Sequence, residues 1–572
     1  NPVWSPDGRW IAVQAEVYPE CGADAECNRT IADSVAGGPL TARMTDELLY
    51  RHWTAWREDR FTHVLLIDAE SGRIVKDLTP GRWDSPTFSV GGGGFAFSPD
   101  GRELCVVSNH DPDPASSTNS DLWLIPVDPE DLSSDAVNIT AANPGWDGSP
   151  VYSPSGRFVA FRSQATAGYE SEFYRIGLYD RAKKTTSYVA DRSHFDDWIE
   201  DLRWSSDERW LYFSAHEKGE TPVYRLDLEA GGVQRVFADG ALVGWGLGGD
   251  DATILYVRSR VGAPPELFRR AVAGGEARAL TSFNDALAAE VDIRPAEVMW
   301  VDSGRGYPIQ VFVVKPHGFD PTRTYPLILN VHGGPQSPWK DRYRGDWQVY
   351  PGKGYVVAFP NPTGSAGFGQ DFVDAIACDW GGRVYDDLMA VTDALEALPF
   401  VDGERMGAMG WSYGGYMMMW FAGHTDRFAA LASMMGVYDL RSMWGATEEL
   451  WFVEKDLCGR PWNSDAYERW SPSAFAEAFE TPTLVVTGEK DFRVPYTQSL
   501  HFFTDLQVRD VPSRLVVFPN AGHWPGWYEM AFYYLVHLDW FARWLGGEPA
   551  PWEPQSFLRN QVFGAGDGTE AR

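Results

Sequence analysis

The sequence contains no long run of apolar residues and is poor in basic ones. Its most aromatic stretch, residues 527–545, is interrupted by Glu529, Asp539 and Arg543. It therefore predicts an amphipathic helix rather than a membrane span. Lysine and arginine number 49 against 80 aspartates and glutamates, a formal charge of −31. Nucleic acids and anionic membranes bind basic surfaces, so we expect neither as a partner.

Cysteine is also scarce, with five residues in a chain of 572. Cys21 and Cys27 are close enough in sequence to form a disulfide, and no histidine or second cysteine pair accompanies them in a metal-binding pattern. A disulfide favours an oxidising location, periplasmic or secreted. Two free thiols and a cytoplasmic location are the alternative. We expect no metal and no organic cofactor.

A ten-residue pattern recurs through the first half of the chain. It reads Trp-Ser-Pro-Asp-Gly-Arg plus apolar residues from Trp4, and related copies begin at Phe97, Tyr152 and Trp204, with a degenerate one near Trp245. Short strands joined by Pro-Asp-Gly turns at intervals of roughly 40 to 50 residues are typical of four-stranded propeller blades. A plain β-sandwich is the alternative, but it gives no reason for one turn to recur.

Five blades are recognisable, with an insertion over residues 14–62. Because a closed ring needs more blades and the chain opens inside a repeat, we expect a fragment or processed product that lacks N-terminal blades. Beyond Ala288, strands alternate with helical segments, a pattern typical of a doubly wound, mostly parallel sheet. We predict a β-propeller over 1–288, an α/β-hydrolase domain over 289–560 and a tail over 561–572.

The most informative motif is Gly-Trp-Ser-Tyr-Gly at residues 410–414, between an apolar run and a second apolar stretch. A nucleophile elbow needs this pattern because glycines on either side of the serine relieve crowding in a sharp strand–turn–helix connection. The motif alone is weak, since it occurs by chance in many chains. It makes Ser412 the candidate nucleophile.

A second motif, His-Gly-Gly-Pro at residues 332–335, follows an apolar run. An α/β-hydrolase takes one oxyanion donor from the backbone N–H after the nucleophile and another from such a glycine-rich loop. We therefore expect the N–H groups of Tyr413 and Gly334, with Gly333 the less favoured choice. An ordinary Gly-Gly-Pro turn is the alternative reading.

An acid and a base complete the set. Asp491 follows the buried run 483–487, and His523 lies in a Gly/Pro-flanked loop after the run 515–518. The carboxyl ends of parallel strands are where such a sheet places functional groups. Three competing histidines lie in helical patterns: His424, His501 and His537. The order Ser412, Asp491, His523 is that of α/β-hydrolases.

These motifs, together with a propeller ahead of a hydrolase domain, resemble the prolyl oligopeptidase family of serine peptidases over nearly the whole chain. The motif at 332–335 points to the branch that contains acylaminoacyl-peptidase and dipeptidyl-peptidase V. The sequences around 18–21, 47–53 and 522–525 are most similar to dipeptidyl-peptidase V. The resemblance implies peptide cleavage through an acyl-enzyme on Ser412.

The resemblance also implies where the substrate binds. The segment after the elbow helix shapes the pocket for the residue before the cut, here Met434, Met435, Val437 and Trp444, which predicts an apolar preference. Filling of the core by the methionines is the alternative. Arg493 resembles a position that holds a backbone carbonyl of the next residue upstream, or it only balances Asp491.

Cleavage type stays open at this point. Release of dipeptides from short peptides needs acidic groups that bind the substrate ammonium, because an unpaired buried cation is costly. Candidates are Glu20, Glu47, Glu58, Asp59, Glu170 and Glu172, but each is more typical of an ordinary surface carboxylate, so we assign none of them as a site. Acylaminoacyl-peptidase or oligopeptidase activity is the alternative. A non-catalytic binding scaffold is the rival class, and the sequence leaves a homodimer open.

Overall fold

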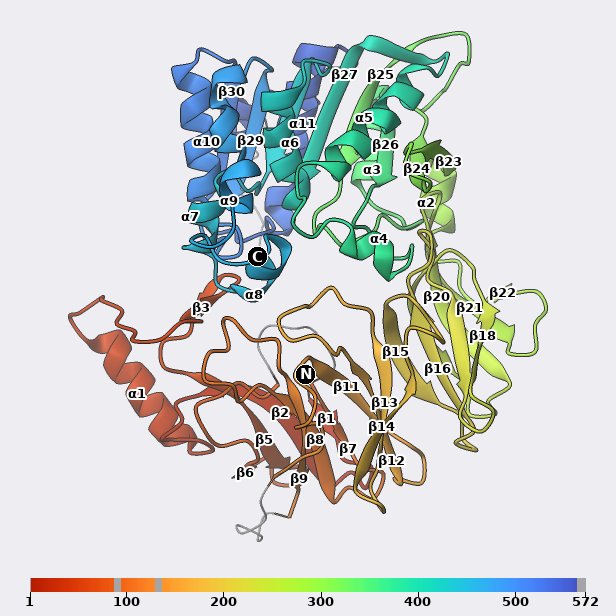
Figure 1. The fold of residues 1–572 in the computed structure, drawn as a ribbon, viewed down its shortest axis with the longest axis vertical. Coiled ribbons are helices and arrows are strands. Elements are labelled where there is room, and N and C mark those ends of the chain that lie inside the picture. The colour runs from red at the N-terminus through yellow and green to blue at the C-terminus, as the bar shows by residue number, and fades with distance from the viewer. Residues whose placement is uncertain (1, 87–93, 129–135, 563–572) are drawn as a thin grey trace, which may run out of the picture.

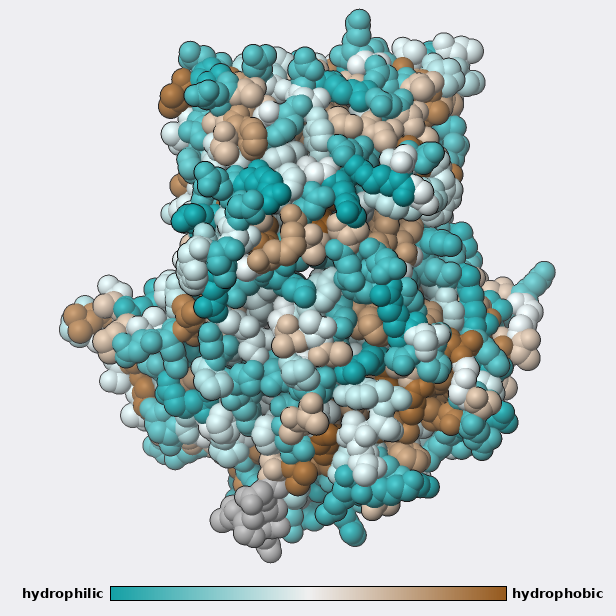
Figure 2. Space-filling view, in the orientation of Figure 1, coloured by the Kyte–Doolittle hydropathy of each residue, from teal (hydrophilic) through white to brown (hydrophobic). Residues whose placement is uncertain are grey.

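The computed structural model describes residues 2–86, 94–128 and 136–562. In Figure 1 the chain forms two parts, one above the other. The lower part, coloured red to yellow, consists of separate small sheets, and the upper part, green to blue, is one large sheet covered by helices. The face in Figure 2 is mostly hydrophilic, with hydrophobic residues in several patches on the lower part and in one just above the junction of the two parts.

Within the described residues, the lower part contains five four-stranded antiparallel sheets. Four of them are built from consecutive strands, and the first omits β3 and β4, which pair with each other. Sheet by sheet, the strands are β1 (Val3–Trp4), β2 (Trp10–Val17), β5 (Phe61–Asp68) and β6 (Ile74–Asp77); β7 (Phe95–Phe97), β8 (Glu103–Ser108), β9 (Asp121–Pro126) and β10 (Val137–Asn138); β11 (Asp147–Tyr152), β12 (Phe158–Ser163), β13 (Arg175–Asp180) and β14 (Thr185–Ala190); β15 (Ile199–Trp204), β16 (Trp210–Ala215), β17 (Val223–Asp227) and β18 (Gly232–Phe237); and β19 (Ala241–Leu247), β20 (Thr253–Arg260), β21 (Ala263–Ala271) and β22 (Arg278–Ala279).

The recurring turn explains why the same pattern repeats. Between β1 and β2, the Ser5 hydroxyl donates to Asp7 Oδ1 at 2.6 Å and accepts from the Trp10 N–H at 2.9 Å. Gly8 follows with φ +72°, a conformation that favours glycine. The equivalent serine–aspartate bonds recur at Ser98 and Ser205. The Ser-Pro-Asp-Gly motif therefore forms a tight turn between the first two strands of a sheet.

An inserted segment separates β2 from β5. It carries α1 (Ala25–Gly37) and a small hairpin of β3 (Arg51–His52) and β4 (Ala55–Trp56), and Cys21 forms a disulfide with Cys27 at its start. The segment spans 18–60 rather than the predicted 14–62. The difference arises because β2 and β5 pair as far as Val17 and Phe61.

The upper part contains an eight-stranded sheet in the order β23-β24-β26-β25-β27-β28-β29-β30. The pairs β23–β24 and β24–β26 are antiparallel and the others are parallel. The strands are β23 (Ala296–Asp302), β24 (Pro308–Val314), β25 (Tyr325–Val331), β26 (Val356–Asn361), β27 (Val401–Trp411), β28 (Ala430–Met434), β29 (Thr483–Gly488) and β30 (Ser513–Phe518).

Helices cover both faces of this sheet, as the period-2 alternation of its strands requires. In β25, Leu327 and Leu329 pack in a core with α5 and α6, while Ile328 packs in a second core with α11. The helices are α2 (Asp285–Glu290), α3 (Asp346–Val349), α4 (Gln370–Asp374), α5 (Arg383–Glu396), α6 (Tyr413–His424), α7 (Leu440–Trp444), α8 (Trp451–Asp456), α9 (Ala466–Arg469), α10 (Thr497–Val508), α11 (Trp527–Leu545) and α12 (Pro554–Leu558), with 3₁₀ turns at Pro351–Lys353 and Pro472–Ala478.

The division predicted near Ala288 lies between β22, the last strand of the five small sheets, and β23, the first strand of the large one. Most of the predicted tail, residues 563–572, lies outside the described residues. The amphipathic helix predicted over 527–545 is α11, and none of the described helices has the length and hydropathy to cross a membrane.

Candidate active site

Ser412 lies at the sharp turn between β27 and α6, with φ +60° and ψ −117°. Such a strained backbone persists only where its surroundings enforce it. A Cβ added to Gly410 would lie 2.3 Å from the Gly414 carbonyl oxygen, and one added to Gly414 would lie 2.1 Å from that of Val331. Both glycines of the motif are therefore required by close backbone packing, as the elbow interpretation predicts.

The two predicted partners lie in adjacent loops. His523 Nδ1 and Asp491 Oδ2 are 2.7 Å apart, with side chains 4% and 0% exposed. Asp491 Oδ1 also accepts from the Val494 N–H at 2.9 Å. Because a carboxylate only accepts, Nδ1 carries the proton of the neutral imidazole and Nε2 is left as the acceptor. The Trp411 indole donates to the His523 carbonyl at 3.0 Å, which ties the histidine loop to the elbow.

One cavity of about 550 Å³ is lined by both Ser412 and His523. Its walls come from the loops at the carboxyl ends of the parallel strands and, through Glu170, from the loop between β12 and β13 in the lower part. The cavity therefore opens between the two parts of the chain. Open α/β sheets bind ligands at this edge.

The glycine-rich loop after β25 lies directly beside the serine. A Cβ added to Gly333 would lie 3.0 Å from the Ser412 Cβ, and Gly334 has φ +120°. Both glycines line the cavity, as does Tyr413. The neighbouring His332 is held by the Ser365 hydroxyl at 2.8 Å, and burial lowers its pKa to about 4, so it is neutral and structural.

The predicted pocket residues divide. Met434 and Val437 line the cavity, whereas Met435 is buried in the core of the sheet. Trp444 lies outside it, in a smaller hollow of about 130 Å³, and its indole donates to Glu454 at 3.1 Å. Further apolar walls come from Trp380, Met443 and Phe452, which sequence reasoning did not identify.

Arg493 also lines the cavity, and two buried carboxylates hold it. Its Nε lies 2.9 Å from Glu448 Oε1, and one of its terminal nitrogens pairs with Glu449 Oε2. The side chains of both glutamates are fully buried, while Arg493 is 15% exposed. The two carboxylates therefore balance the charge of the guanidinium on one side, and its other side faces the cavity. It does not pair with Asp491, the alternative role considered above.

Of the six candidate anchors for a substrate ammonium, Glu170 alone is a cavity residue. Burial raises the pKa of its carboxyl to about 8, with Glu449 adding to the effect. Within the described residues, no hydrogen bond or ion pair reaches this carboxylate. The Glu172 carboxylate is instead occupied by Ala165 and Thr166, and Glu47 lines a different hollow.

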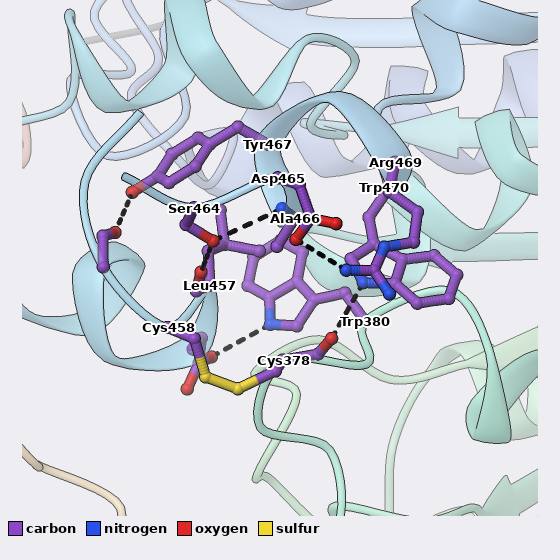
Figure 3. The surroundings of a disulfide bond; sticks show 12 residues. Cys378, Trp380, Leu457, Cys458, Ser464, Asp465, Ala466, Tyr467, Arg469 and Trp470 are labelled. Atoms are coloured by element: carbon purple, nitrogen blue, oxygen red, sulfur yellow. Dashed lines mark hydrogen bonds and ion pairs between the residues drawn. A yellow bond between two sulfur atoms is a disulfide. The ribbon is translucent and has the colours of Figure 1, made fainter. Parts of the chain in front are cut away.

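A disulfide between Cys378 and Cys458 braces one wall of the cavity (Figure 3). It joins the loop that carries Trp380 to the end of α8. The Trp380 indole donates to Asp456 Oδ2 at 3.2 Å, and the Tyr413 hydroxyl donates to the Trp380 carbonyl. The sequence offered no signal for this pair, because the two cysteines are 80 residues apart.

Comparisons with known proteins agree with this geometry. The sequence profile of the prolyl oligopeptidase family matches residues 342–548. Dipeptidyl-peptidase 5 of Porphyromonas gingivalis is 31% identical over 526 residues, covering 88% of this chain and 75% of the relative. Dipeptidyl-peptidase 5 of Aspergillus fumigatus is also 31% identical, covering 86% and 72%.

Solved structures share the fold. The acylaminoacyl peptidase of Pyrococcus horikoshii superposes with a TM-score of 0.80 at 20% identity, covering 98% of this chain and 83% of that one. A puromycin hydrolase superposes with a TM-score of 0.69 at 19% identity, covering 97% and 79%.

Proposed function

The chain belongs to the prolyl oligopeptidase family of serine peptidases, and from this premise we propose that it releases dipeptides from the free N-terminus of short peptides. One observation carries the proposal: a single cavity is lined by Ser412, His523 and the carboxylate of Glu170. The relatives named dipeptidyl-peptidase 5 support the same reading.

In the proposed reaction, the Ser412 hydroxyl attacks the scissile carbonyl while His523 Nε2 takes its proton. The leaving amine then receives that proton, and water releases the dipeptide from the acyl-enzyme by the reverse sequence. Asp491 holds Nδ1–H and stabilises the imidazolium that forms transiently, which its 2.7 Å contact supports. The N–H groups of Tyr413 and Gly334 are proposed to bind the oxyanion.

The residue before the cut is proposed to be apolar. Met434, Val437 and Phe452 line the cavity, and their side chains offer nothing to pair with a charged residue. Arg493 is proposed to donate to the carbonyl of the residue before that. A guanidinium fixed on one side by two carboxylates still presents free N–H donors on the other.

The length of the released piece is proposed to follow from Glu170. A substrate ammonium in a cavity poor in water needs a carboxylate, since an unpaired buried cation is costly. Burial raises the pKa of the Glu170 carboxyl to about 8 although the Arg493 guanidinium opposes the shift, so the charged form is not fully compensated in the cavity. An N-acylated substrate carries no ammonium and would leave Glu170 unpaired. For this reason acylaminoacyl-peptidase activity ranks second, behind dipeptide release.

We also propose that the five small sheets are propeller blades that cover the site and admit short peptides only. The disulfides Cys21–Cys27 and Cys378–Cys458 favour an oxidising location, periplasmic or secreted. A non-catalytic scaffold is disfavoured, because close packing at the elbow and the His523–Asp491 contact are both retained.

Substitution of the nucleophile tests the enzymatic assignment. Ser412→Ala should lower kcat on an unblocked dipeptidyl-4-nitroanilide by about 10⁴–10⁶-fold, because loss of a triad member removes that much catalysis. Thermal unfolding of the variant should match the wild type. Retained activity in a folded variant would contradict the role of Ser412.

A further inference from the structure

The hairpin β3–β4 reaches from the inserted segment of the lower part to the loops of the active site. In Figure 1 it lies between the two parts, close to α8. Trp53, at its turn, has φ +50°, and its carbonyl accepts from the Phe492 N–H at 3.0 Å. A Cβ added to Gly522 would lie 2.1 Å from Thr54 Cγ2. The hairpin thus contacts the loops that carry Asp491 and His523.

The same hairpin binds both carboxylates that hold Arg493. His52 Nε2 lies 2.7 Å from Glu449 Oε1, with both side chains at most 5% exposed. The Trp53 N–H donates to Glu448 Oε2 at 2.5 Å. Each glutamate therefore places one oxygen on Arg493 and the other on the hairpin.

The Trp53 ring completes the contact from the other side. The Arg493 guanidinium lies over this ring at 4.1 Å from its centroid. The ring centroids of His523 and Trp524 lie 6.0 and 5.2 Å from the Trp53 rings. A cation stacked on an aromatic face and paired with two carboxylates has little freedom to rotate.

We propose that His52 and Trp53 are positioning residues for peptide binding: acting through Glu449 and Glu448, they fix the Arg493 guanidinium so that its free donors point into the cavity. This inference rests on the proposed role of Arg493 in binding a substrate carbonyl. It makes the inserted segment part of the substrate site, although 397 residues separate His52 from Glu449 in sequence.

The inference is tested by the kinetics of His52→Phe on a dipeptidyl-4-nitroanilide. Loss of the imidazole leaves Glu449 with an unpaired buried oxygen and frees Arg493, so KM should rise about tenfold while kcat stays within about threefold. Hydrolysis of 4-nitrophenyl acetate, whose acyl group is too short to reach Arg493, should be unchanged. His52→Gln, which restores a donor, should recover most of the lost affinity.

Two controls separate positioning from general damage. Arg29→Ala changes an exposed side chain of α1 in the same inserted segment and should leave hydrolysis of the dipeptidyl substrate and of 4-nitrophenyl acetate unaffected. The kinetics are run on both a free and an N-acetylated dipeptidyl-4-nitroanilide, because either one presents a carbonyl to Arg493. If the protein prefers the acetylated substrate, the proposed dipeptidyl activity fails, but the effect of His52→Phe is then measured on that substrate and still tests the role of His52.

A double-mutant cycle gives the decisive outcome. In an Arg493→Ala background, His52→Phe should have no further effect on KM, because the residue that it positions is gone. Additive effects of the two substitutions would overturn the proposal, as would equal loss of ester hydrolysis in His52→Phe. If His52→Phe fails to fold, Trp53→Leu, which keeps the N–H to Glu448, should raise KM by at least about threefold, and an unchanged KM there would also overturn it.

Discussion

At the scale of single residues, the site depends on where carboxylates are buried and what pairs with them. Asp491 is held by His523 and the Val494 N–H, and Glu448 and Glu449 are held by Arg493. Glu170 is half-buried and makes no hydrogen bond or ion pair with any described group, although the Arg493 charge acts on it. A buried carboxylate without a partner is costly. That cost is tolerable if a bound substrate removes it, and this makes Glu170 the residue to test.

Glu170→Gln should lower kcat/KM for a free dipeptidyl-4-nitroanilide by roughly 10²-fold, because the substrate ammonium loses its counter-charge. The N-acetylated substrate carries no ammonium and should lose less than about threefold. Glu172→Gln is the matched control, since that carboxylate is used by Ala165 and Thr166. Equal losses on both substrates would contradict the anchoring role.

Asp456 offers a test of stability against pH. Burial raises its pKa to about 6 from an ordinary 3.8. The protonated form is therefore favoured in the folded state, so its stabilising contribution is full below pH 3.8 and is lost as pH rises through about 6. Asp456→Asn cannot ionise and keeps an acceptor for the Trp380 indole.

At pH 8 the free energy of unfolding of Asp456→Asn should therefore exceed that of the wild type by roughly 1–3 kcal/mol. The variant should also unfold at a higher temperature. The gain should shrink as pH falls to 4.5. Thermal or urea unfolding at both pH values measures this, and a difference independent of pH would contradict the account.

At the scale of elements, the disulfide Cys378–Cys458 joins the Trp380 loop to α8 and closes a loop of 80 residues. Cys378→Ser/Cys458→Ser should lower the free energy of unfolding by about 2–4 kcal/mol, because the cross-link restricts the unfolded chain. The Cys21–Cys27 disulfide closes a far shorter loop, so Cys21→Ser/Cys27→Ser should lower the free energy of unfolding by less. Urea unfolding under non-reducing conditions compares them, and equal costs would contradict the reasoning.

The elements predictable from the sequence were those with local signals. The recurring Ser-Pro-Asp-Gly turn, the period-2 strands and the elbow at Ser412 each depend on residues within a few positions of one another, and the structure contains all of them. His523 was selected over three other histidines because it alone lies in a loop after a strand, and it contacts Asp491.

The contacts that were missed join distant parts of the chain. In the sequence Glu448 and Glu449 are typical of surface acids, and only the folded structure brings the hairpin at His52 against them. Cys378 and Cys458 likewise come together only through the position of α8. Trp444, predicted in the pocket, faces a separate hollow because its indole pairs with Glu454. Such tertiary pairings have no periodicity or spacing by which a single sequence could reveal them.

At the scale of the whole molecule, the site lies between the two parts, with Glu170 contributed by the lower part and Ser412 by the upper. Peptide size should therefore limit turnover. A tetrapeptide should be cleaved much faster than native albumin, and albumin digested to short peptides beforehand should become a substrate. Mass spectrometry of the products checks both, and rapid cleavage of native albumin would contradict a covered site.

The central claim, release of dipeptides from a free N-terminus by Ser412, is tested most directly by one comparison. The wild-type protein is assayed on an unblocked dipeptidyl-4-nitroanilide with an apolar second residue and on its N-acetylated counterpart, with Ser412→Ala as the blank. We predict that kcat/KM for the unblocked substrate exceeds that for the acetylated one by about 10²-fold or more, because only the free ammonium can pair with Glu170. Faster cleavage of the acetylated substrate would contradict the claim, because the bond after the second residue would then be cut without a free ammonium for Glu170 to bind.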